Sequence, residues 1–131
     1  MGDQVGEAVT GTLYYVSFKE FERIHKFPVN AIEKTAIFAA FCRINTLYMI
    51  ACAGSGHIGS SFSSMDIMSW LQLNEIRRSS DGDETSPRDI FFSSKGHDAP
   101  ALYNIFIGQG KLNFDLIHKL RCLNGLPGHP D

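Results

Sequence analysis

The sequence predicts an α/β fold, of which this chain forms the helix-rich opening part. A long helical pattern covers residues 31–53, and a short apolar run at 88–93 lies between further helical patterns. Such a run is typical of a strand in a parallel sheet that helices cover on both faces. Residues 12–18 are the other run with strand-favouring composition, far upstream. Because a lone strand leaves buried backbone groups unpaired, we expect the parallel-sheet domain to be incomplete in this chain.

The overall composition is that of an ordinary soluble globular chain. Of 131 residues, 44% are hydrophobic and 20% are charged, which argues against a disordered or a membrane protein. A net charge of −2 gives no electrostatic footprint for nucleic acid. Cys42, Cys52 and Cys122 form no C-x-x-C pair, so we expect reduced thiols and a cytoplasmic location. No signal peptide is predicted, because a cationic start followed by an apolar segment is lacking.

Residues 1–29 are predicted to be a leader distinct from the domain that follows at 30–131. Within the leader, residues 12–18 favour a strand and residues 18–24 an amphipathic turn or two of helix. Pro28 is expected to close the segment.

The strongest predicted element is a helix from Ala31 to Ala53. Asn30 is placed to cap it, Glu33 stands at the capping-box position, and Gly54 ends it. Its apolar residues surround the axis, which is typical of a helix buried on several sides. A membrane span is the alternative interpretation, and we expect a buried helix of a soluble domain instead. The reason is that polar side chains in the middle of the helix would be costly in lipid, namely Arg43, Asn45 and Thr46.

Shorter elements are predicted after this helix. Ser63 or Ser64 is placed to cap a second helix from Met65 to Arg77. The next expected elements are a polar loop at 79–87, a buried strand at 88–93, a helix from Pro100 to about Gly108, a helix capped by Asn113 and ending near Leu123, and turns at 125–130.

Three Gly-His pairs are the candidate functional residues. His57, His97 and His129 each follow a glycine at a point where the local pattern breaks, so each imidazole is expected on a loop or at a helix end. Without the surrounding motifs, each histidine has a plainer interpretation. His57 would satisfy a carbonyl at a helix end, His97 would be a loop residue near a helix start, and His129 would belong to a frayed terminus. A zinc site of three histidines is the other chemical interpretation, and it is disfavoured because the set lacks a closely spaced ligand pair.

From Asn30 onward, the chain resembles the N-terminal, thiamine diphosphate-binding domain of transketolases. The resemblance rests on several motifs that occur in one order over the chain, and the intervals between the three histidines also fit. The matching stretches are Gly54-Ser55-Gly56-His57-Ile58-Gly59-Ser60-Ser61, Asp66-Ile67, Arg88-Asp89-Ile90-Phe91-Phe92-Ser93-Ser94-Lys95-Gly96-His97, Ala99-Pro100-Ala101-Leu102-Tyr103 and Leu126-Pro127-Gly128-His129-Pro130-Asp131. Ile58 departs from the family pattern, which has proline after the first histidine, so the sugar substrates are not assigned.

The resemblance implies a role for each candidate residue. His57 would line the substrate channel and help to bind the donor ketose. His97 would lie beside the diphosphate and the reactive ring of the cofactor, and Ser60 matches a position that contacts the cofactor in some relatives. His129 would hydrogen-bond the hydroxyl on the first carbon of the donor. Imidazoles suit these positions because they donate or accept protons near neutral pH.

The resemblance also implies a transferase that moves a two-carbon ketol unit between sugar phosphates, with thiamine diphosphate and Mg²⁺ in the complete enzyme. In this family the metal is held by a Gly-Asp-Gly motif and a following Asn beyond the third histidine, and Asp81-Gly82-Asp83 is not a substitute because it precedes the predicted strand. The isolated chain is therefore expected to have no metal site and no turnover. Its expected partners are the remaining transketolase domains or a complementary subunit, with homo-oligomers in the complete form, and truncation is favoured over a natural split.

A non-catalytic interaction subunit, or a fragment of a pseudoenzyme, is the alternative function. Apolar surface left without its sheet would favour association with other proteins. Neither hypothesis predicts binding to nucleic acid or to a membrane.

Overall fold

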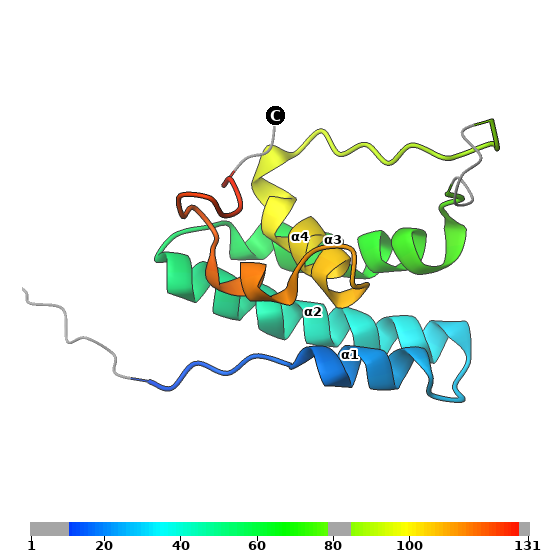
Figure 1. Cartoon of the computed structure of the whole chain (residues 1–131), viewed down its shortest axis with the longest axis horizontal. Coiled ribbons are helices and arrows are strands. Elements are labelled where there is room, and N and C mark those ends of the chain that lie inside the picture. The colour runs from blue at the N-terminus through cyan, green and yellow to red at the C-terminus, as the bar shows by residue number, and fades with distance from the viewer. Residues whose placement is uncertain (1–10, 79–84, 129–131) are drawn as a thin grey trace, which may run out of the picture.

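The computed structural model describes residues 11–78 and 85–128, which form four α-helices and several shorter turns. The helices are α1 (Phe18–His25), α2 (Ala31–Ala53), α3 (Ile58–Trp70) and α4 (Ala99–Gly108). Helix α2 lies in the middle, with α1 on one side and α3 and α4 on the other (Figure 1). A π-helical turn, η1 (Leu71–Glu75), continues α3, and two 3₁₀ turns, η2 (Gly96–Asp98) and η3 (Phe114–His118), lie before and after α4.

The predicted central helix is confirmed at both ends. The side chain of Asn30 accepts a hydrogen bond of 2.8 Å from the backbone N–H of Glu33, which satisfies one of the free donors at the helix start. At the other end Gly54 adopts a left-handed conformation with φ of 76°, and its N–H bonds to the carbonyl of Ile50 at 3.0 Å. The cap and the glycine therefore set the bounds Ala31–Ala53.

The apolar surface of α2 is shared between two core clusters. In the first, Phe21 of α1 and Phe38 of α2 are fully buried and meet edge to face with ring centroids 5.6 Å apart. In the second, Met49 and Ile50 of α2 pack with Ile107 of α4 and with residues near the C-terminus. Burying side chains of this size stabilises a fold by about 1.5–3 kcal/mol each. The leader helix α1 thus packs in the same core as α2.

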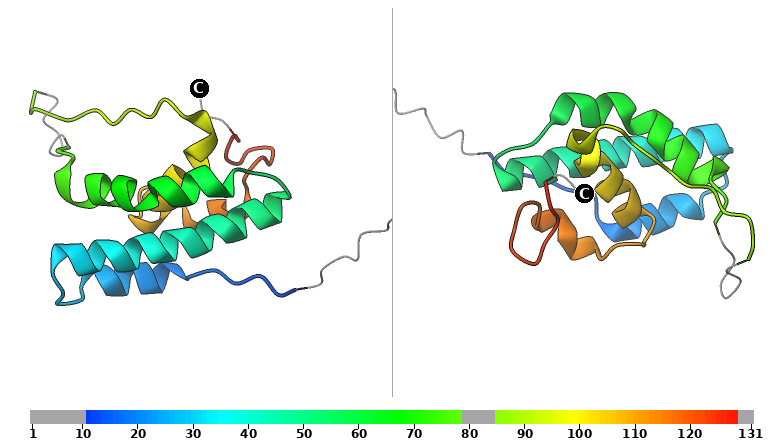
Figure 2. Two further views of the ribbon diagram at one scale, coloured as in Figure 1. Left: turned by 180° about the vertical axis from the view of Figure 1, so that it is seen from behind. Right: turned by 90° about the horizontal axis from the view of Figure 1, so that it is seen from above.

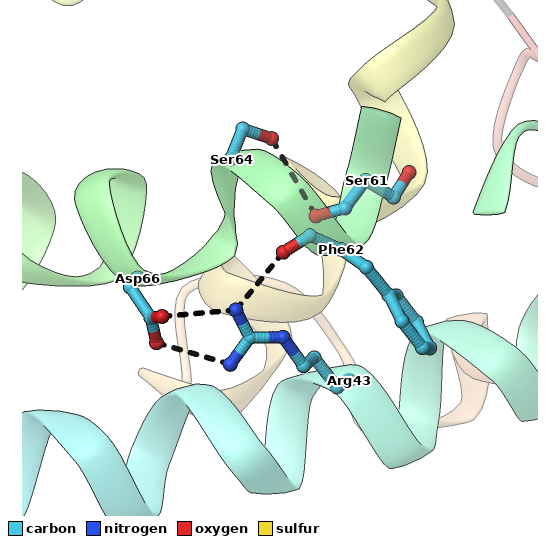
Figure 3. Close-up of polar contacts among 5 residues, drawn as sticks. All are labelled: Arg43, Ser61, Phe62, Ser64 and Asp66. Atoms are coloured by element: carbon cyan, nitrogen blue, oxygen red, sulfur yellow. Dashed lines mark hydrogen bonds and ion pairs between the residues drawn. The ribbon is translucent and has the colours of Figure 1, made fainter. Parts of the chain in front are cut away.

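Two polar residues in the middle of α2 have partners in the fold. Arg43 forms a bidentate ion pair with Asp66 of α3 and also donates to the carbonyl of Phe62 at 2.9 Å (Figure 3). The buried amide of Asn45 pairs with both backbone groups of Val16, at 2.7 and 3.0 Å. By length and composition alone α2 is apolar enough to cross a membrane. In this structure it is the central helix of a bundle, and these polar contacts join it to its neighbours.

The predicted start of the second helix is wrong. Helix α3 begins at Ile58 with His57 at its N-cap, not at Met65, and it ends at Trp70 before the π-helical turn. The two serines predicted to cap it lie inside the helix. Their hydroxyls bond back to the carbonyl of Ser60, at 3.2 Å from Ser63 and 2.7 Å from Ser64. Such bonds within the helix let serine occupy its interior.

The predicted buried strand at 88–93 is also wrong as a local structure. The segment is extended, but no strand forms among the described residues, so the parallel sheet remains a prediction. Ile90 and Phe92 are 86% and 83% exposed, whereas Phe91 packs against the core. Figure 1 shows the segment crossing above the helices, and both views of Figure 2 agree. Residues 11–17 are likewise extended without forming a strand, while the helix predicted at 18–24 is confirmed as α1.

The last predicted elements have mixed outcomes. Helix α4 is confirmed, with Pro100 in its first turn. Asn113 caps the next turn by accepting from the N–H of Asp115 at 2.9 Å, but only the short 3₁₀ turn η3 forms, ending at His118 rather than near Leu123. The following chain turns back, and Leu120 and Leu126 form an isolated bridge. The loop expected at 79–87 is described only from residue 85 onward.

Candidate functional site

The loop that presents His57 passes close to the end of α2 at Gly56. After Gly54 ends α2, Gly56 passes so close to Ile50 that a Cβ atom at this position would lie 2.8 Å from the Ile50 Cγ1 atom. The chain then enters α3, with His57 at its N-cap and no side-chain cap on the helix. His57 is therefore an exposed residue at the positive end of a helix.

His97 occupies an equivalent place before α4. It lies half-buried in the 3₁₀ turn η2, directly before the helix. The neighbouring Asp98 is buried and accepts hydrogen bonds of 3.3 Å from the hydroxyl of Ser93. A carboxylate at a helix N-terminus is stabilised by the partial positive charge there. Asp98 was not predicted as a site residue, and its signal in the sequence is an acidic residue two positions before Pro100.

The structure brings the first two histidines together. Their ring centroids are 5.2 Å apart, and the ring planes are inclined by 64°, an edge-to-face arrangement. The two imidazoles come from the N-terminal ends of α3 and α4, which pack against each other. Two imidazoles, each at the positive end of a helix, make this end of the bundle suitable for an anionic ligand.

Ser60, which the resemblance implies as a cofactor contact, lies in the first turn of α3. Its hydroxyl oxygen is buried and has no hydrogen-bond partner among the described residues, as is also true of Ser61. A buried hydroxyl without a partner is uncommon in a folded protein. The Ser60 hydroxyl thus has unused hydrogen-bonding capacity, and the fold covers it in this structure.

The chain that leads to the third histidine is anchored close to this site. The hydroxyl of Tyr103 in α4 donates to the carbonyl of Pro127 at 2.8 Å, and burial raises the pKa of this tyrosine, which keeps its proton in place. Arg121 donates to the hydroxyl of Ser55 at 2.6 Å, two residues before His57. His129 itself lies outside the described residues.

Tyr103 and Arg121 were missed as site residues for different reasons. Tyr103 belongs to a motif that was recognised, but its contact with Pro127 joins distant parts of the chain. Arg121 has no local signal, because the residue that it contacts lies 66 positions earlier.

A cavity of about 260 Å³ lies beside the loop that carries His97. Its polar lining residues are Ser93, Lys95 and Asp98. Its apolar lining residues lie before and after the loop in the sequence. The complete lining is Phe91, Phe92, Ser93, Lys95, Gly96, Asp98, Ala99 and Leu102. The cavity thus adjoins the histidine pair without including it.

The described residues offer no cluster for a metal ion. Across 11–78 and 85–128, no three His, Cys, Asp or Glu side chains gather closely enough to hold one. Asp81 and Asp83 lie outside this part of the chain.

Comparison with known proteins places these loops in one family. A family profile described as "Transketolase, thiamine diphosphate binding domain" matches residues 33–131, a range that contains all three Gly-His pairs. This chain belongs to the transketolase family. Human transketolase is 32% identical over 110 residues, which cover 83% of this chain and 18% of the human protein. The transketolase of Pongo abelii matches at the same identity and over the same shares.

A second group of relatives in the transketolase family is also similar. Transketolase-like protein 2 of mouse is 33% identical over 89 residues, covering 67% of this chain and 14% of that protein. The chain therefore spans less than a fifth of the length of the curated relatives it matches, 18% for human transketolase.

Proposed function

We propose that this chain supplies the histidine-bearing side of a transketolase site. In that role it would bind thiamine diphosphate and a sugar phosphate and take part in the transfer of a two-carbon ketol unit. The observation that carries the proposal is the contact between His57 and His97 at the ends of α3 and α4, with ring centroids 5.2 Å apart. Both residues lie within the range that matches the thiamine diphosphate-binding domain.

The residues of this end of the bundle fit part of the cofactor. His97 and the uncapped start of α3 suit the diphosphate, because helix N-termini bind anions through their free N–H groups. The unpartnered hydroxyl of Ser60 supplies a further hydrogen-bonding group. Mg²⁺ has no matching set of carboxylates among residues 11–78 and 85–128. The metal ligands would come from other parts of a complete enzyme.

The chemical roles that we propose for the histidines follow from the properties of imidazole. When bound, thiamine diphosphate supplies the electron sink, and the protein supplies orientation and electrostatics. His57 would hydrogen-bond the hydroxyl groups of the donor ketose, and His97 would hold a proton beside the cofactor. His129 would orient the first hydroxyl of the donor. General acid–base groups of this kind contribute about 10²–10⁴-fold to a rate.

A chimeric enzyme provides the test. Residues 30–131 of this chain would replace the matching part of human transketolase, and ketol transfer would be measured with standard sugar phosphates. We expect an active chimera that loses about 100-fold or more of kcat/KM on His97→Ala substitution. The exposed His118→Ala, in η3 and outside the histidine pair, is the matched control within the replaced range. A folded, active chimera that is insensitive to His57→Ala and His97→Ala would contradict the proposal.

The second candidate function is a non-catalytic interaction subunit. It is favoured by apolar side chains that the described structure leaves exposed, with Ile90 at 86% and Leu123 at 94%. This function predicts a chimera without activity and a chain that binds a partner polypeptide tightly. The homo-oligomer expected for the complete enzyme belongs to the first proposal.

A further inference from the structure

Arg121 has a backbone conformation that arginine seldom adopts. Its φ is 59°, in the left-handed region, where residues other than glycine are uncommon. The surrounding loop holds it there, because the N–H of Arg121 bonds to the carbonyl of Leu126 at 2.7 Å and the N–H of Leu126 bonds to the carbonyl of Lys119 at 2.9 Å. Unfavourable conformations that the surroundings enforce tend to occur at functional sites.

The side chain of Arg121 touches two of the three Gly-His loops. Its Nη1 atom donates to the Oγ atom of Ser55 at 2.6 Å, next to Gly56 and His57. Its Nε atom lies against Gly128, where an added Cβ atom would be only 2.6 Å away. One guanidinium thus joins the loop before α3 to the loop near the C-terminus. Arginine is suited to this because its planar group donates in several directions.

Arg121 contributes little to the core. It is exposed, and it belongs to neither buried cluster. Its strained backbone is therefore not explained by packing of its own side chain. Its side chain instead holds Ser55, in the loop that leads to His57. His57 in turn contacts His97.

We propose that Arg121 is a positioning residue that, through Ser55, sets the place of His57 against His97. Its importance for catalysis rests on the proposed function, but the positioning itself is a property of this chain without cofactor. Without the guanidinium, the loop of Gly54–His57 loses its tie to the C-terminal loop, and the imidazole of His57 samples positions away from that of His97.

The test uses the full 131-residue chain without cofactor. Arg121→Asn removes the guanidinium and keeps a residue that tolerates a left-handed backbone, and Ser55→Ala removes the acceptor. Asn124→Gly is the matched control, since Asn124 is exposed in the same loop with φ of 61° and, among the described residues, no hydrogen bond joins it to Ser55 or Gly128. The readouts are the nuclear Overhauser effect between the rings of His57 and His97, amide hydrogen exchange at His57, and the thermal midpoint.

We expect both test variants to lose the ring–ring effect and to speed exchange at His57 by about fivefold to tenfold, as local opening becomes easier. The thermal midpoint should stay near that of the wild type, and Asn124→Gly should change none of the three readouts. Because the two residues act through one bond, the double variant should match the single variants. If Arg121→Asn fails to fold, Ser55→Ala alone carries the test.

Two results would overturn the proposal. One is a ring–ring effect that persists in Arg121→Asn or, if that variant does not fold, in Ser55→Ala. The other is exchange in the double variant that equals the product of the single effects. Since no cofactor is present, either result leaves the chimera test of the proposed function unaffected, and failure of the chimera leaves this result standing.

Discussion

At the scale of single residues, the close approach of Gly56 to Ile50 predicts that even a methyl group is harmful there. A Cβ atom at position 56 would lie 2.8 Å from the Ile50 Cγ1 atom, and Ile50 is buried. Overpacking of this kind costs about 1–3 kcal/mol. We expect Gly56→Ala to lower the free energy of unfolding by that amount, measured by urea denaturation, and to displace His57.

Gly59→Ala is the control for that substitution. Gly59 lies within α3, and a Cβ atom there would meet nothing within 4 Å. Alanine is favoured over glycine inside a helix, so this variant should be stabilised by up to about 1 kcal/mol. Equal stabilities for the two variants would show that Ile50 does not constrain the loop.

The three cysteines are predicted to differ in reactivity. Cys42 is buried, and burial raises the pKa of its thiol well above the usual value, whereas Cys52 and Cys122 are exposed. Because the thiolate is the reactive form, we expect two fast-reacting thiols at pH 8 in an assay with an aromatic disulfide reagent. Cys42 should react only under denaturing conditions. Cys42→Ala, which keeps both exposed thiols, should leave the fast phase unchanged, and a third fast thiol in the folded wild type would contradict the structure.

At the scale of elements, the ion pair between α2 and α3 predicts a dependence of stability on pH. Arg43 bonds to both carboxylate oxygens of Asp66 at 3.0 Å, and these hydrogen bonds lower the pKa of Asp66 (Figure 3). A lowered pKa in the folded state means that the stabilisation is present above the carboxyl's ordinary pKa of about 3.9 and is lost as the pH falls through the folded-state value. The side chain of Asp66 is 68% exposed, so the contribution is at most about 1 kcal/mol.

Asp66→Asn measures that contribution. We expect the variant to be less stable than the wild type at pH 6, and the difference to shrink toward pH 3 as the wild-type carboxylate is protonated. Glu20→Gln is the control variant, which removes the exposed ion pair between Glu20 and Arg23, with an N–O distance of 3.5 Å. It should lower the free energy of unfolding by no more than a few tenths of a kcal/mol. A difference for Asp66→Asn that grows on acidification would show that the pair does not stabilise the folded state.

Sequence alone predicted elements well where their limits are set by local groups. Asn30 and Gly54 satisfy the ends of α2 by contacts within a few residues, so its approximate bounds were confirmed. The start of α3 was missed because serine serves both as a cap and, when its hydroxyl bonds back to a carbonyl, as an interior residue, as Ser64 does. The partners of Ser55 and Pro127 were beyond reach, because Arg121 and Tyr103 come from distant parts of the chain.

At the scale of the whole molecule, the two glycine-histidine loops in the described region lie at one end of the bundle because their helices pack together. The first loop starts α3 and the second starts α4, and both helices lie on the same side of α2 (Figure 1). Their separate motifs were readable in sequence, but the 5.2 Å separation of the rings is a consequence of helix packing. A strand, in contrast, forms only when a partner strand pairs with it. The apolar pattern at 88–93 therefore did not predict a buried strand correctly, because no partner strand forms among the described residues.

That extended segment gives the last prediction. Ile90 and Phe92 are 86% and 83% exposed, and an exposed apolar segment outside any sheet is a template for association between chains. We expect Ile90→Lys and Phe92→Lys to leave the free energy of unfolding within about 0.5 kcal/mol of the wild type. Both should shift sedimentation velocity profiles at high protein concentration toward the monomer. The half-buried neighbour Phe91 contacts the core, so Phe91→Lys is the contrasting variant and should destabilise the chain. If Ile90→Lys and Phe92→Lys destabilise the chain as much as Phe91→Lys, the segment is packed on both faces and the description of Ile90 and Phe92 as exposed is wrong.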